Sequence, residues 1–214
     1  MRKFIIAAVA VFGTYASNAQ DYKAPLEKTF GIFDTSTVME NKIEMANKVS
    51  LIAKKWSGEW QTHYYAGLCK TVLSYMEKDA TKRDAYLDEA EKEHDDAVSV
   101  QKKENDETYV LAAMIANARL AVDGSTRWMK YGKIFTANLE SAKKLNPDNP
   151  RIYYLDGTAK LFTPKAFGGG KKAAMPYFEK AAPLFEKEAG ADITKPHWGK
   201  DRNAMHLAEC KAGE

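Results

Sequence analysis

The chain has 214 residues, of which 45% are hydrophobic and 29% are charged, a composition typical of a globular protein with a sizeable core. Its 32 basic and 29 acidic residues give a formal net charge of +3. Such a nearly neutral chain offers no overall charge with which to attract nucleic acid or an anionic membrane.

The first nineteen residues have the pattern of a secretory signal peptide. A short basic start is followed by an apolar run from Phe4 to Phe12, and Ser17 and Ala19 place small residues at a cleavage site. The alternative is an uncleaved anchor, but the apolar run of about a dozen residues is shorter than the ~20 that a spanning helix needs. We therefore expect cleavage after Ala19 and a periplasmic mature protein, with no lipid attachment site and no transmembrane segment.

Residues 20–214 are expected to form one all-helical domain. Apolar residues recur three and four positions apart, the spacing of a helix face, whereas alternating strand patterns and Asn-Gly or Asp-Gly hairpin turns are missing from the sequence. Short turns between long helices indicate antiparallel helix pairs. In chain order, the pattern predicts helices over 36–54, 60–75, 81–98, 105–120, 125–142, 150–161, 171–189 and 198–211.

Three of the expected helix pairs share a spacing of large and small residues. Small residues let two helices approach closely, and an aromatic residue fills the groove between them. The first pair shows the spacing loosely over 65–97, and the second shows it over 109–147. In the third pair the residues concerned are Tyr153, Gly157, Ala174, Phe178 and Ala181.

This spacing resembles the tetratricopeptide repeat, although Gly157 and Ala174 are 17 positions apart where the ordinary repeat has about 12. The stretches NPDNPRIYYL, FGGGKKAAMPYFEKA and HWGKDR, with Gln20 after the cleavage site, resemble a family of exported tetratricopeptide-like proteins of Bacteroidetes-type bacteria. The resemblance covers nearly the whole mature chain. It implies antiparallel helix pairs stacked as a short right-handed superhelix, with flanking helices at 36–54 and 198–211. The family has no assigned reaction, so no mechanism is implied.

The three glycines from Gly168 to Gly170, next to two lysines, raise the question of a phosphate-binding loop. Such a loop needs a glycine in place of Lys165, a serine or threonine in place of Lys172, and a preceding strand, so the motif fails three times. We expect a wide turn between two helices, with Phe167 filling the space that the long connection leaves. A weaker hypothesis is that Lys171, Lys172 and the N-terminus of the next helix hold an anionic group.

The sequence contains no recognised catalytic or metal-binding motif. Its four histidines form no His-Glu-x-x-His pattern, and the acidic run from Glu91 to Asp96 around His94 spreads over all sides of a helix. No Gly-x-Ser-x-Gly motif is present. Cys69 and Cys210 fall at opposite ends of the helical array, so we expect two buried, unbridged thiols. We predict no enzyme activity, no metal and no cofactor, and a hydrolase of unrecognised type is the least favoured hypothesis.

The resemblance also implies where a partner binds, because the first helix of each tetratricopeptide pair lines the concave surface. The positions that the family exposes there mix aromatic and polar side chains, which suits a peptide or a small ligand. The alternative is that several of them pack against neighbouring helices. The predicted groove residues are Trp60, His63, Lys70, Glu107, Met114, Asn117, Arg151, Tyr154 and Thr158.

Two hypotheses for the function follow. The first is an exported binding or scaffold protein that presents this groove to a protein or peptide in the cell envelope. The second is a small-molecule-binding partner of an envelope transport system. An open groove favours the first hypothesis, and a deep closed pocket favours the second. Neither involves nucleic acid.

Overall fold

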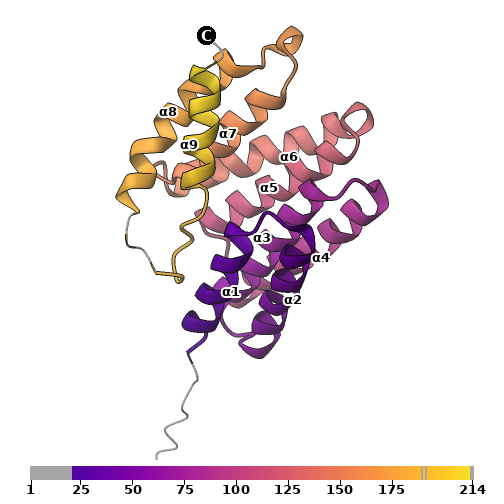
Figure 1. Ribbon diagram of the computed structural model, residues 1–214, viewed down its shortest axis with the longest axis vertical. Coiled ribbons are helices and arrows are strands. Elements are labelled where there is room, and N and C mark those ends of the chain that lie inside the picture. The colour runs from indigo at the N-terminus through magenta and orange to yellow at the C-terminus, as the bar shows by residue number, and fades with distance from the viewer. Residues whose placement is uncertain (1–20, 189, 191, 213–214) are drawn as a thin grey trace, which may run out of the picture.

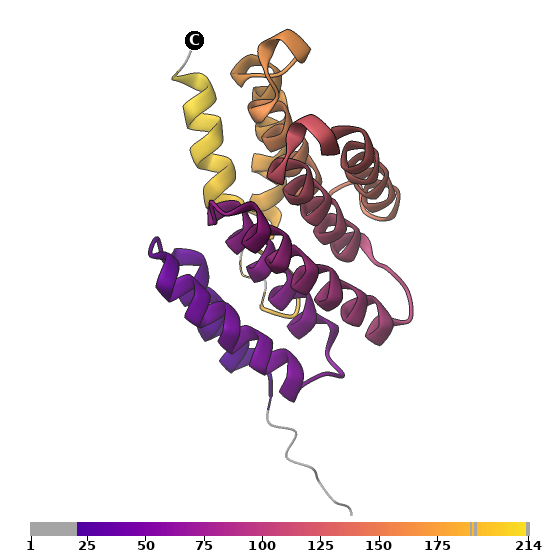
Figure 2. The same ribbon diagram turned by 90° about the vertical axis from the view of Figure 1, so that its right-hand side faces the viewer.

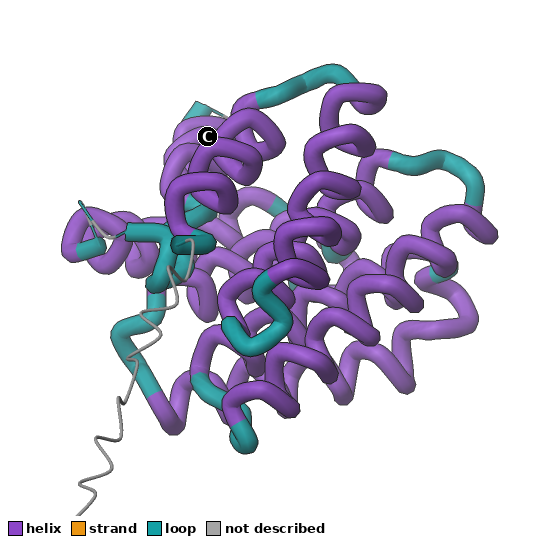
Figure 3. Tube along the Cα trace, turned by 90° about the horizontal axis from the view of Figure 1, so that it is seen from below, coloured by secondary structure: helices purple, strands orange, loops and turns teal. Residues whose placement is uncertain are grey.

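The computed structural model describes residues 21–188, 190 and 192–212, so the predicted signal peptide lies outside it. The described residues form nine α-helices and one short 3-10 helix and contain no strand (Figure 3). The helices are α1 (Lys23–Thr35), α2 (Met39–Lys55), α3 (Trp60–Met76), α4 (Ala80–Gln101), α5 (Asp106–Val122), α6 (Gly124–Leu145), α7 (Pro150–Phe162), α8 (Lys171–Lys187) and α9 (Lys200–Lys211).

The helices are arranged as successive pairs from one end of the molecule to the other (Figure 1). α3 packs most extensively on α4, α5 on α6 and α7 on α8, and these are the three pairs that the residue spacing predicts. α5 also contacts both α3 and α7, so the first helices of the pairs adjoin one another. Figure 2 shows the same succession from the side, with α9 beside α8. The expected all-α, helical-repeat fold is confirmed.

One close contact explains the small residue in the third pair. Gly157 of α7 faces the ring of Phe178 on α8, and a Cβ atom at residue 157 would lie 2.7 Å from Phe178 Cε1. Real Cβ atoms do not approach a ring so closely, so only glycine allows α7 and α8 to pack at this distance.

The sequence pattern missed α1. Its buried residues Leu26, Phe30 and Phe33 have regular helical spacing, but Pro25 and Gly31 lower the helix propensity of the stretch. The end of α1 is stabilised by Lys42 of α2, a buried lysine whose ammonium group donates hydrogen bonds to the carbonyl oxygens of Phe33 and Asp34. These bonds satisfy carbonyl groups that a helix end leaves unpaired.

The connection between α7 and α8 is a compact, self-bonded loop. The N–H of Gly170 donates to the carbonyl of Lys160 at 2.9 Å, and Gly168 and Gly170 have φ of 77° and 94°, which glycine adopts without strain. The expectation that Phe167 fills a gap is wrong, because its side chain is 80% exposed. The loop closes through its own backbone and leaves no gap for the ring.

Both cysteines are free and buried, as expected. Burial raises the pKa of the Cys69 thiol, which keeps it protonated and unreactive. In the part of the chain that the structure describes, no helix has both the length and the apolar character needed to cross a membrane.

Candidate functional site

A small cavity of about 90 Å³ lies where α1, α3, α5, α7 and α9 meet the connection between α8 and α9. We call the part of this connection that directly precedes α9 the α8–α9 segment and define it as residues 192–199. Larger hollows are present beside the segment and along α6, but each is open to solvent and lined by a single stretch of chain. The cavity draws on distant parts of the chain, which is typical of a binding site.

The cavity is aromatic inside and charged at its rim. Its interior side chains include Phe30, Phe33, Leu68, Met114, Tyr154 and Trp198. Charged side chains of both signs, Asp34, Lys200, Asp201 and Arg202, complete the lining. Tyr154 joins the interior to the aromatic core, because its ring lies 6.1 Å from Trp198 and 6.5 Å from Phe185, edge to face in both cases.

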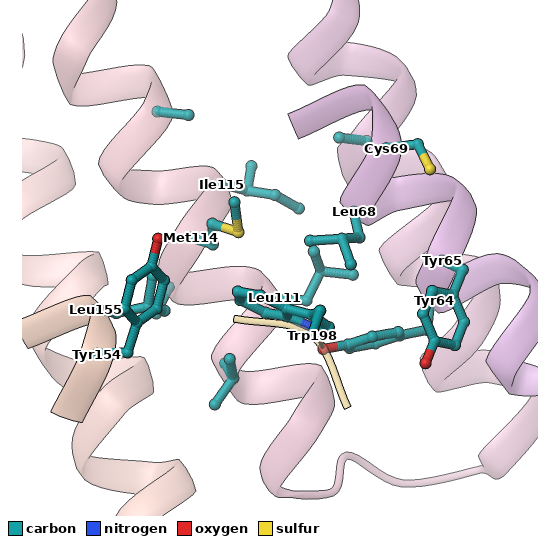
Figure 4. Packing of buried hydrophobic residues seen from close by; sticks show 14 of the residues in the cluster. Tyr64, Tyr65, Leu68, Cys69, Leu111, Met114, Ile115, Tyr154, Leu155 and Trp198 are labelled. Carbon is teal, nitrogen blue, oxygen red and sulfur yellow. Dashed lines mark hydrogen bonds between the residues drawn. The ribbon is translucent and has the colours of Figure 1, made fainter. Parts of the chain in front are cut away.

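Trp198 holds the α8–α9 segment against the inner helices. Its indole N–H donates to the hydroxyl of Tyr64 at 2.8 Å, and that hydroxyl donates to Glu107 at 2.9 Å. Figure 4 shows Trp198 and Tyr64 meeting beside Leu111. Elsewhere in the segment, Ile193 is fully buried and the amide of Gln61 donates to the carbonyl of Thr194 at 3.3 Å.

A buried ion pair stands behind this contact. Arg151 is 1% exposed, and its guanidinium lies 2.6 Å from a carboxylate oxygen of Glu107 and 2.7 Å from one of Glu188. It also donates to the carbonyl of Trp198 at 3.3 Å. Asn149 donates a further hydrogen bond to Glu107 at 2.7 Å, so the buried carboxylate accepts hydrogen bonds from several side chains.

Burial and ion pairing together determine the pKa values of Arg151 and Glu107. Burial alone would lower the pKa of Arg151, but the neighbouring Glu107 and Glu188 raise it, so the guanidinium stays protonated. Burial raises the pKa of Glu107, and Arg151 opposes that rise. The pair therefore depends on both partners, because either charge alone would be buried without compensation.

Four of the predicted groove residues come together at this site. Met114 and Tyr154 line the cavity, and Glu107 and Arg151 form the ion pair behind it. The other predicted residues contact neighbouring side chains or backbone outside the cavity. Trp60 lies edge to face with Tyr64 at 5.8 Å.

The remaining four predicted residues are held by local hydrogen bonds or are half-buried. His63 bonds to Glu93 at 2.7 Å, Lys70 pairs with Glu89 at 2.7 Å, and the hydroxyl of Thr158 donates to the carbonyl of Tyr154 at 2.8 Å. Asn117 is half-buried. Of the nine predicted residues, six are buried, which agrees with the alternative that several pack inside the protein. The physical reason is that the α8–α9 segment covers Arg151 and Tyr154, whereas His63 and Lys70 pack against α4.

Sequence reasoning missed the parts of the site that α1 and the α8–α9 segment supply. Phe30 and Phe33 lie on the helix that the pattern did not predict. Trp198 belongs to the stretch HWGKDR, which carries part of the family resemblance but has no periodic apolar pattern. Trp198 is the first residue of the helix predicted over 198–211, whereas α9 begins at Lys200 and the tryptophan lies before it, packed onto the core.

One group of potential metal ligands also differs from the sequence prediction. His63 lies with Glu93 and Asp96, and their ligand atoms are within 4.8 Å of one another. In the sequence His94 is the histidine of this acidic run, whereas in the structure His63 from the neighbouring helix lies beside Glu93 and Asp96. His63 already bonds to Glu93 and to the carbonyl of Ser57, at 2.7 and 3.3 Å, so the group links α3 to α4 without a metal ion.

Comparisons with known proteins give one informative likeness. No family model matches the chain, and no curated protein matches it. Among solved structures, two chains match, and one is the HusA haemophore from Porphyromonas gingivalis. It superimposes with a TM-score of 0.77 and 29% sequence identity, over 92% of this chain and 96% of the haemophore. The likeness supports the expected Bacteroidetes-type protein, but nothing in it tests membership of the tetratricopeptide family.

Proposed function

We propose that this chain is a non-enzymatic binding protein whose ligand is a haem-like porphyrin, taken up in the cavity under the α8–α9 segment. The observation that carries the proposal is the likeness to a haemophore, a haem-carrying protein, over nearly the full length of both chains at 29% identity. Export to the periplasm, as the signal-peptide pattern predicts, is part of the proposal.

The chemistry of the cavity supports a planar, apolar ligand with carboxylate groups. The rings of Phe30, Phe33 and Tyr154 offer faces and edges against which a macrocycle can pack. Lys200 and Arg202, at the same site, are suited to the propionate carboxylates of haem. Histidine, methionine and tyrosine are side chains that bind haem iron, and His197, Met114 and Tyr154 all line the cavity.

The size of the cavity requires a change of shape on binding. Its volume of about 90 Å³ is well below the roughly 300–1,000 Å³ of small-molecule sites. The α8–α9 segment is the part that must move, because it is the covering that lacks helical structure. In the proposed complex, the ligand takes the place of Trp198 between α3, α5 and α7.

The same covering favours a small ligand over a peptide. A peptide groove needs an accessible concave surface, whereas the α8–α9 segment lies across the inner helices and buries Trp198 and Ile193 there. Of the two hypotheses from the sequence, the small-molecule one therefore has more support. The protein or peptide hypothesis becomes the alternative.

The test is titration of residues 20–214 with haemin, followed by the Soret absorption band. We expect saturable binding that weakens about tenfold or more in Tyr154→Ala, which removes a ring from the cavity. Arg202→Glu should also weaken binding, and its side chain is exposed, so the fold is preserved. Lys172→Glu, a matched charge reversal in the first turn of α8, should bind as the native chain does. Absence of saturable binding, or equal binding by all three variants, would refute the proposal.

A further inference from the structure

We propose that the α7–α8 loop is a membrane-docking element that inserts Phe162 and Phe167 into the interface of an anionic lipid bilayer. The loop comprises residues 162–170 and lies at the end of the molecule near the C-terminus of α9, at the top of Figure 1. It is separate from the cavity, and the inference does not depend on what the cavity binds.

The first observation is the exposure of two aromatic rings, one at the end of α7 and one in the short 3-10 helix Lys165–Phe167 that follows it. Phe162 is 74% exposed and Phe167 is 80% exposed, which makes them the two most exposed large hydrophobic side chains among the described residues. The ring of Phe162 lies edge to face with His206 of α9 at 6.2 Å, and Phe167 follows five residues later in the same short connection. Grouped exposed apolar side chains mark interaction sites more often than scattered ones do. Both rings lie in the connection that is about five residues longer than in the ordinary repeat.

The second observation is that the loop is built to hold this shape. The N–H groups of Phe167 and Gly169 donate to the carbonyl of Pro164 at 2.9 and 3.3 Å, and Gly170 bonds back to α7. A Cβ atom at residue 169 would lie 2.0 Å from the carbonyl oxygen of Thr163, so the loop closes tightly on itself. The exposure of the rings is therefore fixed by backbone structure and does not follow from a lack of order.

The third observation is the charge around the rings. No acidic residue occurs from Gly157 to Phe178, whereas this stretch contains four lysines. Lys171 pairs with Glu209 of α9 at 3.4 Å, and the side chains of the other three lysines are exposed. The lysines of the stretch are Lys160, Lys165, Lys171 and Lys172. With Glu209 counted against its partner Lys171, the nearly neutral chain thus carries a local net charge of +3 near two exposed phenyl rings.

These observations fit a lipid surface better than a protein surface. The rings project from a turn and do not line a groove, so a partner protein would need a pocket shaped for both of them. A bilayer interface accepts protruding aromatic rings without such a pocket, and anionic headgroups attract clustered lysines. The loop has both features and needs no conformational change to present them.

The test is co-sedimentation of residues 20–214 with phosphatidylcholine vesicles that contain or lack phosphatidylglycerol. We expect binding only to the anionic vesicles and a loss of binding at high salt. Phe162→Ser/Phe167→Ser should lower the partition coefficient by about tenfold or more, because each ring buries apolar surface. Lys165→Gln/Lys172→Gln should lower it less.

The matched control is Trp128→Ser/Met129→Ser on α6, since these side chains are 59% and 60% exposed and also have lysine neighbours. This variant should bind vesicles as the native chain does, and circular dichroism should show that every variant is folded. Failure of the native chain to bind anionic vesicles would overturn the proposal and leave an acidic protein surface as the partner. Equal binding by the double-phenylalanine variant, or loss of binding only in the α6 variant, would also overturn it.

Discussion

Charged side chains are usually exposed and apolar side chains are usually buried, and two regions of this molecule depart from that rule. They are the interior behind the cavity and the α7–α8 loop. Behind the cavity, Arg151 and Glu107 are charged and buried, whereas on the loop Phe162 and Phe167 are apolar and exposed. In both places, hydrogen bonds hold the side chains in an environment that is unfavourable for them. The charges have several hydrogen-bond partners each, and the loop that carries the rings is closed by its own backbone bonds.

The difference between the two regions concerns what depends on them. The buried charges connect α5, α7 and the α8–α9 segment, so their removal should change stability. The exposed rings make few contacts within the protein, so their removal should change interactions with other molecules and leave stability almost unchanged. Measurements of unfolding can test this division.

The largest expected effect is that of Arg151→Met. The variant leaves Glu107 and Glu188 without their main partner, and such a broken buried pair costs about 3–5 kcal/mol of unfolding free energy. Urea denaturation followed by circular dichroism measures this. Arg119→Met is the matched control: Arg119 is also buried, but it pairs with carboxylates of Asp84, Asp88 and Glu91 that are partly exposed, so its loss should cost less. A smaller loss for Arg151→Met than for the control would contradict the comparison.

A second, smaller effect concerns the tight packing of the interior. Gly157→Ala places a Cβ atom against the ring of Phe178 and should destabilise the fold by about 1–3 kcal/mol. Gly31→Ala in α1 is the control, because nothing lies within 4 Å of the added atom. It should raise the stability by up to about 1 kcal/mol through helix propensity. Thermal unfolding of both variants should give opposite shifts, and equal shifts would contradict the predicted packing.

A third effect is a pH dependence at His63. Its hydrogen bond to Glu93 raises the pKa of the imidazole above its ordinary value of 6.5. The protonated pair therefore contributes fully to stability below pH 6.5, and this contribution is lost as the pH rises through the folded-state pKa. Glu93→Gln should remove this component, which amounts to about 1 kcal/mol or less. Denaturation curves of both proteins between pH 5 and pH 9, about the range where histidine titrates, are the measurement. Parallel pH profiles would refute the assignment.

The smallest effect is expected for the exposed rings. Phe162→Ser/Phe167→Ser should change the unfolding free energy by no more than about 0.5 kcal/mol, as is usual for exposed positions. Phe33→Ala removes a ring that is 1% exposed and should lower the unfolding free energy by about 3–5 kcal/mol. Chemical denaturation of the two variants compares them directly. A large loss in the loop variant would show that its rings serve the fold.

The sequence predicted the paired helices because helix faces repeat with a fixed period. Gly157 and Phe178 could be assigned to a contact from spacing alone, and the structure has that contact. α1 could not be predicted in this way, because Pro25 and Gly31 mask a short apolar face. The spacing rules work where many similar residues repeat, and they fail where a single helix breaks the pattern.

The candidate site was predictable only in part, for a related reason. Met114 and Tyr154 followed from their place on an inner helix face, but the residues that cover them did not. The α8–α9 segment has no periodicity, so nothing in the sequence indicates which helices it crosses. The pairing of Arg151 with Glu107 was equally hidden, since both residues were predicted to face a partner and not each other.

The contact between Trp198 and Tyr64 joins residues that are 134 positions apart, which bears on the order of events during synthesis. Adjacent helices can pair as they leave the ribosome, because their contacts are local. The cavity cannot close until residue 198 is available, when most of the chain has already been made. A ribosome that stalls within α8 would therefore leave paired helices with an uncovered aromatic surface, which is the form of this protein that a chaperone is expected to meet.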